Sequence, residues 1–487
     1  MNYNSEKGMV INMRLEKATP ESQGIPSSAI LNFLNKVNEQ GFEVHSFMLL
    51  KNGKNIADCW WKPYAAQYRH QLFSLSKSFT SMAIGLAIEE GLLTTGTLIA
   101  DIFADEMKEL GEKVDEKMRK MTVKNLLTMG TGMTYENWVW DDEKSNNILG
   151  FLSSHVKNEP GSAFFYNTLA TYMCSAIITR LTGQKLVDYL TPRLFEPLGI
   201  DPVWDEDKLG ISFGGFGLNI KTEDIAVFGQ MLLQKGKFNG RQLVPESWVE
   251  EATSKQINNG DEADSDWAQG YGYQFWRCVP EGVYRGDGMY GQYCIVMPDQ
   301  NSVIAVTSNV DMGKFMKLIW SELLPCLGGG NVLPQCDDYS KLVEFGTRQT
   351  HLQVNENAEP YPSFRGAYRL SSDTKAPDDF KINRVDFDFE NGECLLAIYN
   401  DESHQPLYVI RFVQKQWVET AKPFWEPGSY YRAVCYGEWN HEEFAASIWH
   451  YETPVNTKFR FAFSEERKNL TLHLEAQIEM PLKFVKI

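Results

Sequence analysis

The order of strand-like and helix-like segments is the feature that most constrains how this chain can fold. Short runs of β-prone residues occur early in the chain and again after a long interval, at 44–50, 55–61, 271–278, 292–297 and 302–307. The first two runs flank Asn52-Gly53, a dipeptide typical of tight hairpins. Between the early and late runs, apolar residues recur at helical spacing, at 74–93, 123–129, 169–181, 186–194, 222–234 and 245–253. Because the early and late strands must pair across this helical region, we predict an α+β domain with an antiparallel sheet flanked by helices.

The composition and the pattern of apolar residues change after residue 327. Gly328-Gly329-Gly330 and the polar stretch that ends at 360–362 are typical of a linker. From about residue 363, short β-prone runs separated by turn residues recur to the end, which predicts an all-β sandwich or barrel. The predicted regions are an N-terminal extension at 1–15, the α+β domain at 16–325, a linker at 326–362 and a β-rich domain at 363–487.

The overall charge restricts the expected partners. The chain of 487 residues carries 47 lysines and arginines against 64 acidic residues, a net charge of −17. Phosphates attract basic surfaces, so we expect neither a nucleic acid nor an anionic membrane as partner. No run approaches the ~18 apolar residues of a membrane span, and the N-terminus lacks the apolar core of a signal peptide. We therefore expect a soluble cytoplasmic protein.

Cysteine and histidine spacing indicates no metal site. None of the eight cysteines forms a C-x-x-C pair, and the eight histidines are dispersed without an H-E-x-x-H pattern. A chain of this length needs no disulfides to stabilise its core, so free thiols in a reducing compartment are expected. We predict neither a metal nor a cofactor.

A serine and a lysine one helical turn apart open the helix predicted at 74–93. In Ser74-Leu75-Ser76-Lys77 the lysine lies on the same face as the serine. A lysine in a water-poor pocket is more easily neutral, and it can then accept the proton of the serine hydroxyl. Free N–H groups at the start of a helix suit a developing oxyanion. The alternative is chance, since this spacing arises about twice in a chain of this length; the other two occurrences, at 154–157 and 372–375, start no apolar helix.

Residues 73–80 resemble the nucleophile helix of the serine β-lactamase-like hydrolases. This family includes class C β-lactamases, D-alanyl-D-alanine peptidases, esterases and nylon-oligomer amidases (6-aminohexanoate-dimer hydrolases). Further blocks follow in the family's order, at 126–133, 160–166, 181–183, 195–200, 214–218, 222–224 and 239–244. The resemblance spans roughly residues 20 to 310. It implies a β-lactamase/transpeptidase-like antiparallel sheet with a helical subdomain, and an active site between the two that needs no cofactor.

By this resemblance Tyr166 is the second catalytic residue. We expect its phenol beside the Lys77 ammonium, which would lower the pKa of the phenol and let it exchange a proton with the serine or the leaving group. An ordinary core tyrosine is the alternative, since the chain holds 21 tyrosines. Where the family has Tyr-x-Asn, this chain has Tyr166-Asn167-Thr168. Either a hydroxyl replaces the substrate-binding amide or Asn167 takes over its role, which fits the esterase and amidase branches best.

The third motif of the family is altered in this chain. Where the family has Lys-Thr-Gly or His-x-Gly, the chain reads Tyr-Arg-Gly-Asp-Gly over 284–288. Arg285 either supplies the missing cation or pairs with Asp287 on the surface of a Gly-rich turn; both remain open. By the same resemblance, a backbone N–H near Gly291 or Gln292 is the second oxyanion donor beside that of Ser74. Without Lys-Thr-Gly, substrates that carry a carboxylate are less favoured.

Two tryptophans, Trp138 and Trp140, lie in a polar loop of the predicted helical subdomain. They either wall an apolar substrate pocket or simply anchor the loop.

With this resemblance, the sequence predicts a serine hydrolase that cleaves an ester or amide bond of a small-molecule substrate through an acyl-serine intermediate. Ser74 is the nucleophile, and Lys77 and Tyr166 are the general base and acid. A β-lactamase or penicillin-binding D-Ala-D-Ala carboxypeptidase is the alternative within the family. A weakly catalytic binding or sensor module on the same fold is the alternative outside enzymes.

Overall fold

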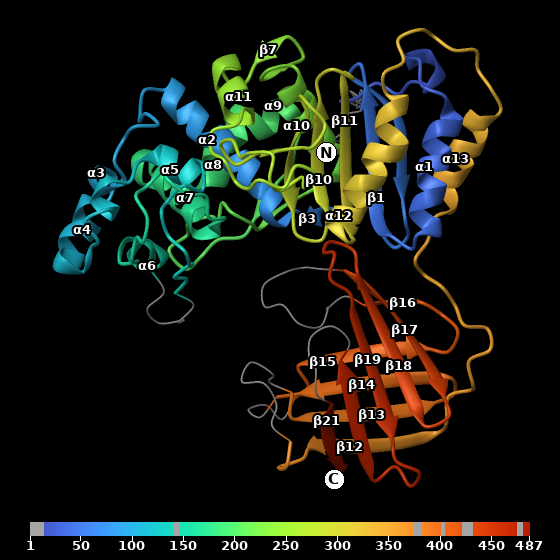
Figure 1. The fold of residues 1–487 in the computed structure, drawn as a ribbon. Coiled ribbons are helices and arrows are strands. Elements are labelled where there is room, and N and C mark those ends of the chain that lie inside the picture. The colour runs from blue at the N-terminus through green and yellow to red at the C-terminus, as the bar shows by residue number, and fades with distance from the viewer. Residues whose placement is uncertain (1–13, 140–145, 375–381, 401–404, 421–431, 475–480) are drawn as a thin grey trace, which may run out of the picture. The chain divides into compact units, whose positions relative to one another are not determined.

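The computed structural model describes residues 14–487 except 140–145, 375–381, 401–404, 421–431 and 475–480. The described chain forms two compact units (Figure 1). The first contains the chain up to Trp60 and then Arg69–Arg348, and the second contains Trp61–Tyr68 and Gln349–Ile487. The stretch 326–362, for which the sequence predicts a linker, includes helix α13 (Asp338–Arg348), which belongs to the first unit and packs against helix α1 (Ser27–Glu39).

An antiparallel sheet of six strands forms the centre of the first unit. Its order is β2-β1-β11-β10-β9-β8, with bounds β1 Glu43–Lys51, β2 Lys54–Trp60, β8 Trp276–Arg277, β9 Tyr284–Gly288, β10 Gln292–Met297 and β11 Ser302–Asn309. Strands β1 and β2 meet at Asn52 and Gly53, which both have positive φ, as a tight hairpin requires. Strand β1 pairs with β11 from Glu43↔Asn309 to Lys51↔Ser302. The predicted α+β class, with pairing between early and late strands, is confirmed.

Helices cover both faces of this sheet (Figure 1). On one face, Phe33 of α1 and Phe315 of α12 (Met312–Leu318) pack together and α1 contacts Phe47 of β1. On the other face, α10 (Thr222–Leu233) packs on β10, β11 and β1. The helix α2 (Ser76–Glu89) lies beside α10, where Phe79 and Phe228 stack with ring centroids 3.8 Å apart. Helix α2 is therefore buried almost along its whole length, which holds its first turn rigidly.

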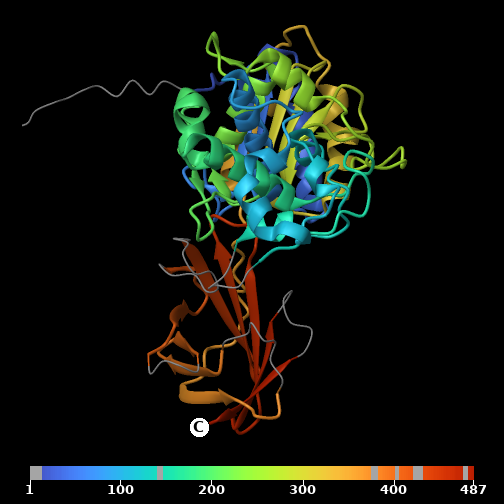
Figure 2. The ribbon, with the colours of Figure 1, turned by 90° about the vertical axis from the view of Figure 1, so that its left-hand side faces the viewer.

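Most of the remaining helices of the first unit gather in one region, which faces the viewer in Figure 2. Their bounds are α3 Ile99–Ile102, α4 Ala104–Leu110, α5 Val123–Leu127, α6 Asn147–Leu152, α7 Thr168–Thr182, α8 Leu186–Leu190, α9 Glu196–Leu198 and α11 Glu246–Thr253. Short strands accompany them, β3 His70–Gln71, β4 Val203–Trp204, β5 Leu218–Ile220, β6 Lys237–Phe238 and β7 Arg241–Gln242. Helix α7 packs against α2, α5, α6 and α8 and forms the centre of this region. No helix within the described ranges has the length and apolar character of a membrane span.

One predicted strand, 271–278, is shorter in the structure, where only β8 at Trp276–Arg277 remains. Gln274 has a φ of 68°, a left-handed conformation that interrupts an extended strand. Its side-chain amide donates to the carbonyls of Leu126 and Leu127, so the chain turns here toward the helical region. The pattern of apolar residues does not predict hydrogen bonds made by a side chain, so it does not predict this turn.

The second unit contains one antiparallel sheet of ten strands. Its order is β15-β14-β13-β12-β21-β20-β19-β18-β17-β16, with bounds β12 Phe364–Leu370, β13 Arg384–Glu390, β14 Glu393–Tyr399, β15 Tyr408–Val413, β16 Val418–Thr420, β17 Ala433–Asn440, β18 Glu443–His450, β19 Thr457–Phe463, β20 Asn469–Leu474 and β21 Leu482–Lys486. The two end strands, β15 and β16, are joined by a short turn that contains the bridge Val413↔Gln416, and β15 contacts both β16 and β17. Buried and exposed residues alternate along most strands, so one face of the sheet surrounds an aromatic core. The predicted all-β domain is therefore barrel-like.

Candidate active site

The Ser74 hydroxyl lies at the start of the buried helix α2. A short 3-10 turn, η2 (Phe73–Leu75), leads into α2, and Phe73 has a φ of 49°. The Lys77 ammonium lies 3.0 Å from Ser74 Oγ, as the one-turn spacing predicts. It also donates to the carbonyl of Gly215 at 2.8 Å and contacts Thr168 Oγ1 at 3.3 Å. Three oxygens thus hold the lysine nitrogen against the serine hydroxyl.

Burial controls the charge of Lys77. The side chain is almost completely inaccessible to solvent. Loss of hydration lowers the pKa of Lys77 to about 7, although the carboxylates of Glu136 and Asp287 act in the opposite direction. A large fraction of the lysine is therefore neutral near pH 7 and can accept the proton of Ser74.

The phenol of Tyr166 is hydrogen-bonded to Ser74. Its ring lies beside Lys77, whose Nζ is 4.9 Å from the ring centroid. The sequence predicts a lowered pKa for this phenol, and that prediction is wrong. Burial, reinforced by the negative charge of Asp287, raises the pKa of Tyr166 well above its usual value. Tyr166 therefore remains a neutral phenol, suited to donate or relay a proton rather than to act as a phenolate base.

The end of strand β9 lies directly against the turn that carries Ser74. A Cβ at Gly288 would lie 2.0 Å from the carbonyl oxygen of Leu72, so only glycine permits this approach. Within the part of the chain that the structure describes, the backbone N–H groups of Ser74, Met289 and Tyr290 donate to no acceptor. These groups are therefore available to bind an oxyanion between η2 and the β9–β10 hairpin.

The two residues predicted to donate to the oxyanion are otherwise engaged. The N–H of Gly291 closes the hairpin by donating to the carbonyl of Gly288 at 3.0 Å, so the prediction for Gly291 is wrong. Gln292 is the first residue of β10, pairs with Gly288 and has a fully buried side chain. Its amide donates to the carbonyls of Met289 and Ser308 at 2.9 and 2.8 Å. The two residues therefore shape the hairpin rather than contact a substrate.

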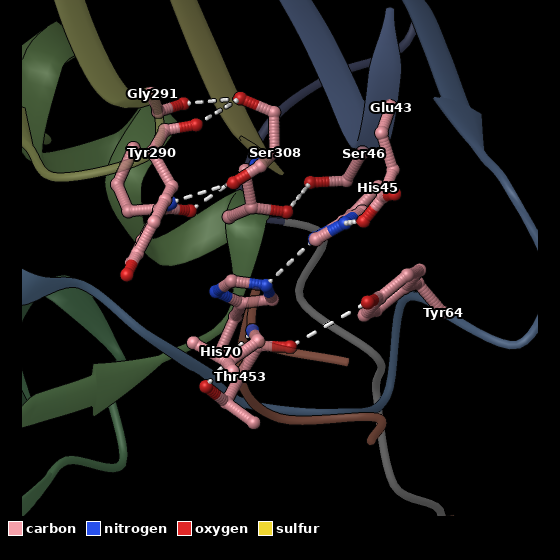
Figure 3. A network of polar contacts seen from close by, with 12 residues as sticks. Glu43, His45, Ser46, Tyr64, His70, Tyr290, Gly291, Ser308 and Thr453 are labelled. Atoms are coloured by element: carbon pink, nitrogen blue, oxygen red, sulfur yellow. Dashed lines mark hydrogen bonds and ion pairs between the residues drawn. The ribbon is translucent and has the colours of Figure 1, made fainter. Parts of the chain in front are cut away.

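Ser308 on β11 fixes the same hairpin from the other side (Figure 3). Its hydroxyl lies 2.7 Å from the carbonyl oxygen of Gly291 and 3.1 Å from that of Tyr290. Tyr290 has a φ of 67°, and its ring packs edge-on against Phe73 with centroids 5.4 Å apart. The hairpin and the nucleophile turn are thereby held together.

Two buried histidines support the strand that precedes the nucleophile turn (Figure 3). His45 Nδ1 lies 3.0 Å from His70 Nε2, and His70 Nδ1 lies 3.0 Å from the carbonyl oxygen of Gln71. Burial and the neighbouring His45 hold the pKa of His70 well below its usual value, so His70 is neutral. The histidine pair therefore anchors β3, only a few residues before Ser74.

Arg285 does not present its charge to a substrate. The side chain is fully buried on β9, and its Nε donates to Asp287 Oδ2 at 2.9 Å. Its Nη1 donates to the carbonyl of Asp266 at 2.9 Å. Of the two alternatives left open by the sequence, the pairing with Asp287 is the one observed. It lies inside the protein on a strand and not on the surface of a turn.

Asn167 and Trp138 have structural partners. Asn167 is fully buried and caps helix α7, its Oδ1 accepting from the N–H of Ala170 at 2.9 Å. The predicted substrate-binding role of Asn167 is therefore not available, and the next residue, Thr168, faces Lys77 instead. Trp138 packs edge-on against Tyr172 and Phe216, which favours loop anchoring. Trp140 lies outside the described residues.

Glu136 is a site residue that the sequence analysis missed. Its Oε1 accepts from the N–H of Thr168, and its Oε2 accepts from the indole N–H of Trp138. The carboxylate therefore ties the loop before α6 to the start of α7, next to Lys77 and Tyr166. A single acidic residue in a loop has no spacing signal, so only the folded chain shows this role.

Comparisons with known proteins identify the family of the chain. A family model described as Beta-lactamase matches residues 14–320. The 6-aminohexanoate-dimer hydrolase of Paenarthrobacter ureafaciens is 24% identical over 324 residues, which cover 61% of this chain and 81% of that protein. The lovastatin esterase of Penicillium rubens is 26% identical over 165 residues, covering 28% of this chain and 40% of that esterase.

Solved structures show the same fold. A putative 6-aminohexanoate-dimer hydrolase from Bacillus anthracis has a TM-score of 0.53 at 21% identity, over 66% of this chain and 89% of that one. SurE, solved with D-Leu, has a TM-score of 0.50 at 15% identity over 94% of this chain and 99% of that one, so the likeness extends into the second unit. Because the family model matches more than half of the residues, the chain belongs to the Beta-lactamase family.

Proposed function

We propose that this protein is a serine hydrolase that cleaves an ester or amide bond through an acyl intermediate on Ser74. The observation that carries the proposal is the contact between Ser74 Oγ and the buried Lys77 Nζ at 3.0 Å, with Tyr166 hydrogen-bonded to the same hydroxyl. A nucleophile, a base with a pKa of about 7 and a neutral phenol are the groups that acyl transfer needs near neutral pH.

Acylation follows from these positions. Neutral Lys77 accepts the proton of Ser74 as the serine oxygen attacks the carbonyl carbon. The N–H of Ser74 and one from Met289 or Tyr290 donate to the developing oxyanion. Tyr166 then donates its proton to the leaving alcohol or amine as the bond to the carbonyl carbon breaks, and protonated Lys77 passes the proton taken from Ser74 to Tyr166. In the second half of the reaction, water attacks the acyl-serine while neutral Lys77 accepts a proton from the water. That proton passes to Ser74 Oγ as the bond between the acyl group and the serine oxygen breaks.

The site favours neutral esters or amides over substrates that carry a carboxylate. The only arginine of the altered third motif is buried and paired with Asp287, so the motif offers no free cation. The activities named for two relatives, a 6-aminohexanoate-dimer hydrolase and a lovastatin esterase, support amide and ester substrates. Stable labelling of Ser74 by a fluorescent penicillin would instead favour the β-lactamase and penicillin-binding alternative.

Replacing the nucleophile tests the proposal directly. We expect Ser74→Ala to abolish hydrolysis of p-nitrophenyl esters and labelling by a fluorophosphonate, because the Ser74 hydroxyl is the one in contact with both Lys77 and Tyr166 among the described residues. Ser372→Ala is the matched control, since Ser372 also begins a Ser-x-x-Lys sequence but is exposed. Full activity in Ser74→Ala would show that the nucleophile lies elsewhere.

A further inference from the structure

Three residues on adjacent strands form a buried cluster next to the catalytic tyrosine. Trp276 on β8 is the direct cross-strand partner of Arg285 on β9. Asp287 lies two residues further along β9 and therefore on the same face as Arg285. Asp287 accepts a hydrogen bond from Arg285 at 2.9 Å and another from the indole N–H of Trp276. The three side chains thus hold one another within a single face of the sheet.

The rings and the guanidinium of this cluster are stacked in sequence. The Arg285 guanidinium lies 4.9 Å from the ring centroid of Trp267 and 5.6 Å from that of Trp276. Tyr166 stacks on Trp276, with ring centroids 5.4 Å apart and an angle of 21° between the rings. Trp276 is therefore in contact with both the buried ion pair and the phenol that is bonded to Ser74.

We propose that Trp276, held by the buried Arg285–Asp287 pair, is a positioning residue that orients Tyr166 for proton transfer at Ser74. The inference rests on the proposed function and assigns a new role to the altered third motif. Arg285 and Asp287 act inside the protein through Trp276 and touch no substrate.

The need for such a support follows from where Tyr166 lies. It precedes helix α7, so its backbone lies outside the hydrogen bonds of that helix. Proton transfer requires the phenol oxygen to stay within hydrogen-bond distance of Ser74, and a displacement of about 1 Å can cost about a hundredfold in rate. A stacked ring limits tilt of the phenol, and Tyr271, edge-on at 6.4 Å and 88°, limits rotation from a second side.

The ion pair makes this support rigid. Arg285 cannot move freely because it also donates to the carbonyl of Asp266 and to Cys278 Sγ. Separating Arg285 from Asp287 would leave two buried charges without compensation, which is strongly unfavourable. Trp276 is therefore fixed by both its stacking contact and its N–H, and Tyr166 receives a fixed surface to lie against.

The test compares Trp276→Leu and Trp276→Phe in the full chain, with kcat and KM measured for p-nitrophenyl acetate and p-nitrophenyl butyrate. Trp276→Leu removes the stacked ring, and we expect kcat to fall about ten- to a hundredfold for both esters, with KM unchanged within about twofold. Trp276→Phe keeps a ring against Tyr166 but loses the N–H to Asp287, so we expect it to recover most of the activity, with kcat about threefold below wild type.

Trp248→Phe is the matched control. Trp248 also packs against a tyrosine, Tyr273, with ring centroids 5.3 Å apart and an angle of 31° between the rings, and its indole N–H also donates, to the carbonyl of Ser81. It lies outside the site, and its variant should retain wild-type kcat.

A substrate-wall role for Trp276 predicts a different pattern, in which KM rises by factors that differ between the two esters. That pattern, or an unchanged kcat in a folded Trp276 variant, would overturn the inference. If Trp276→Leu does not fold, the threefold loss in Trp276→Phe decides the question. Absence of fluorophosphonate labelling in the wild-type protein would instead refute the proposed function itself.

Discussion

At the residue scale, the protonation state of Lys77 determines when Ser74 can be activated. Because the base must be neutral and burial brings the pKa of Lys77 to about 7, kcat/KM for a neutral ester should rise with pH through about 7. A profile that is flat between pH 5 and 9 would contradict this role for the lysine.

The negative charge of Glu136 raises the pKa of Lys77, so removing that charge should lower this pKa. In Glu136→Gln the ammonium loses a stabilising negative charge, so the pKa of Lys77 falls and the rising limb of the profile moves to lower pH. Glutamine keeps an oxygen that can accept from the N–H of Thr168. Glu159→Gln, at an exposed surface ion pair with Lys117, is the control and should leave the profile unchanged. A shift to higher pH would show that Glu136 acts in another way.

The sequence predicts contacts between residues that are close together in the chain. It does not predict pKa shifts or ion pairs that depend on how deeply the fold buries a side chain. Ser74 and Lys77 lie one helical turn apart, so their contact follows from helix geometry alone. The direction of the Tyr166 pKa shift depends on how much water the fold excludes and on Asp287, far away in the sequence. The buried position of Arg285 is equally invisible in a run of glycines and charges.

At the element scale, strand β9 sets the geometry of the nucleophile turn through its two glycines. A Cβ at Gly286 would lie 2.5 Å from Leu75 Cδ1 and from Ser78 Oγ, and one at Gly288 would lie 2.0 Å from the backbone oxygen of Leu72. A side chain can shift, whereas the carbonyl of Leu72 is part of the turn that carries Ser74. Gly288 is therefore the less tolerant position.

We expect Gly288→Ala to reduce kcat/KM by at least about tenfold, because the added methyl group displaces either η2 or the hairpin and separates the oxyanion donors. The unfolding temperature should change much less than the activity. Gly313→Ala is the control, since its Cβ would meet no atom closer than 3.7 Å and it lies on helix α12. Wild-type activity in Gly288→Ala would mean that β9 does not contribute to the oxyanion site.

The order of helices and strands can be predicted from the sequence because it depends on the spacing of apolar residues. The residues at which each element begins and ends cannot be predicted in this way. Periodicity located α2, α7 and α10, and the Asn-Gly dipeptide located the β1–β2 hairpin. The strand predicted at 271–278 shrank to β8 because Gln274 turns the chain with side-chain hydrogen bonds. The linker predicted over 326–362 contains α13, a polar helix with one buried leucine, Leu342, whose apolar face is too narrow to stand out.

At the scale of the whole molecule, the chain passes into the second unit at Trp61, returns to the first unit at Arg69, and passes into the second unit again after Arg348. Between β2 and β3, the segment Trp61–Tyr68 belongs to the second unit. There Tyr68 stacks on Tyr451 with centroids 4.9 Å apart, and Tyr64 packs edge-on against Trp449. The β domain is thus completed by residues that precede the nucleophile turn in the sequence, which a division of the chain into consecutive regions does not anticipate.

A truncation after Arg348 should therefore behave differently from removal of an independent appended domain. It would leave the buried ring of Tyr64 and the partly buried ring of Tyr68 without Trp449 and Tyr451, and complete burial of an aromatic side chain contributes about 2 kcal/mol. We expect the truncated chain to aggregate on gel filtration, and Tyr64→Ser combined with Tyr68→Ser to restore a monodisperse protein. The same double substitution in the full chain should lower the unfolding temperature of the second unit, because in the full chain the two tyrosine rings pack against Trp449 and Tyr451. A truncated chain that is already monodisperse with both tyrosines would show that Trp61–Tyr68 does not depend on the strands of the second unit.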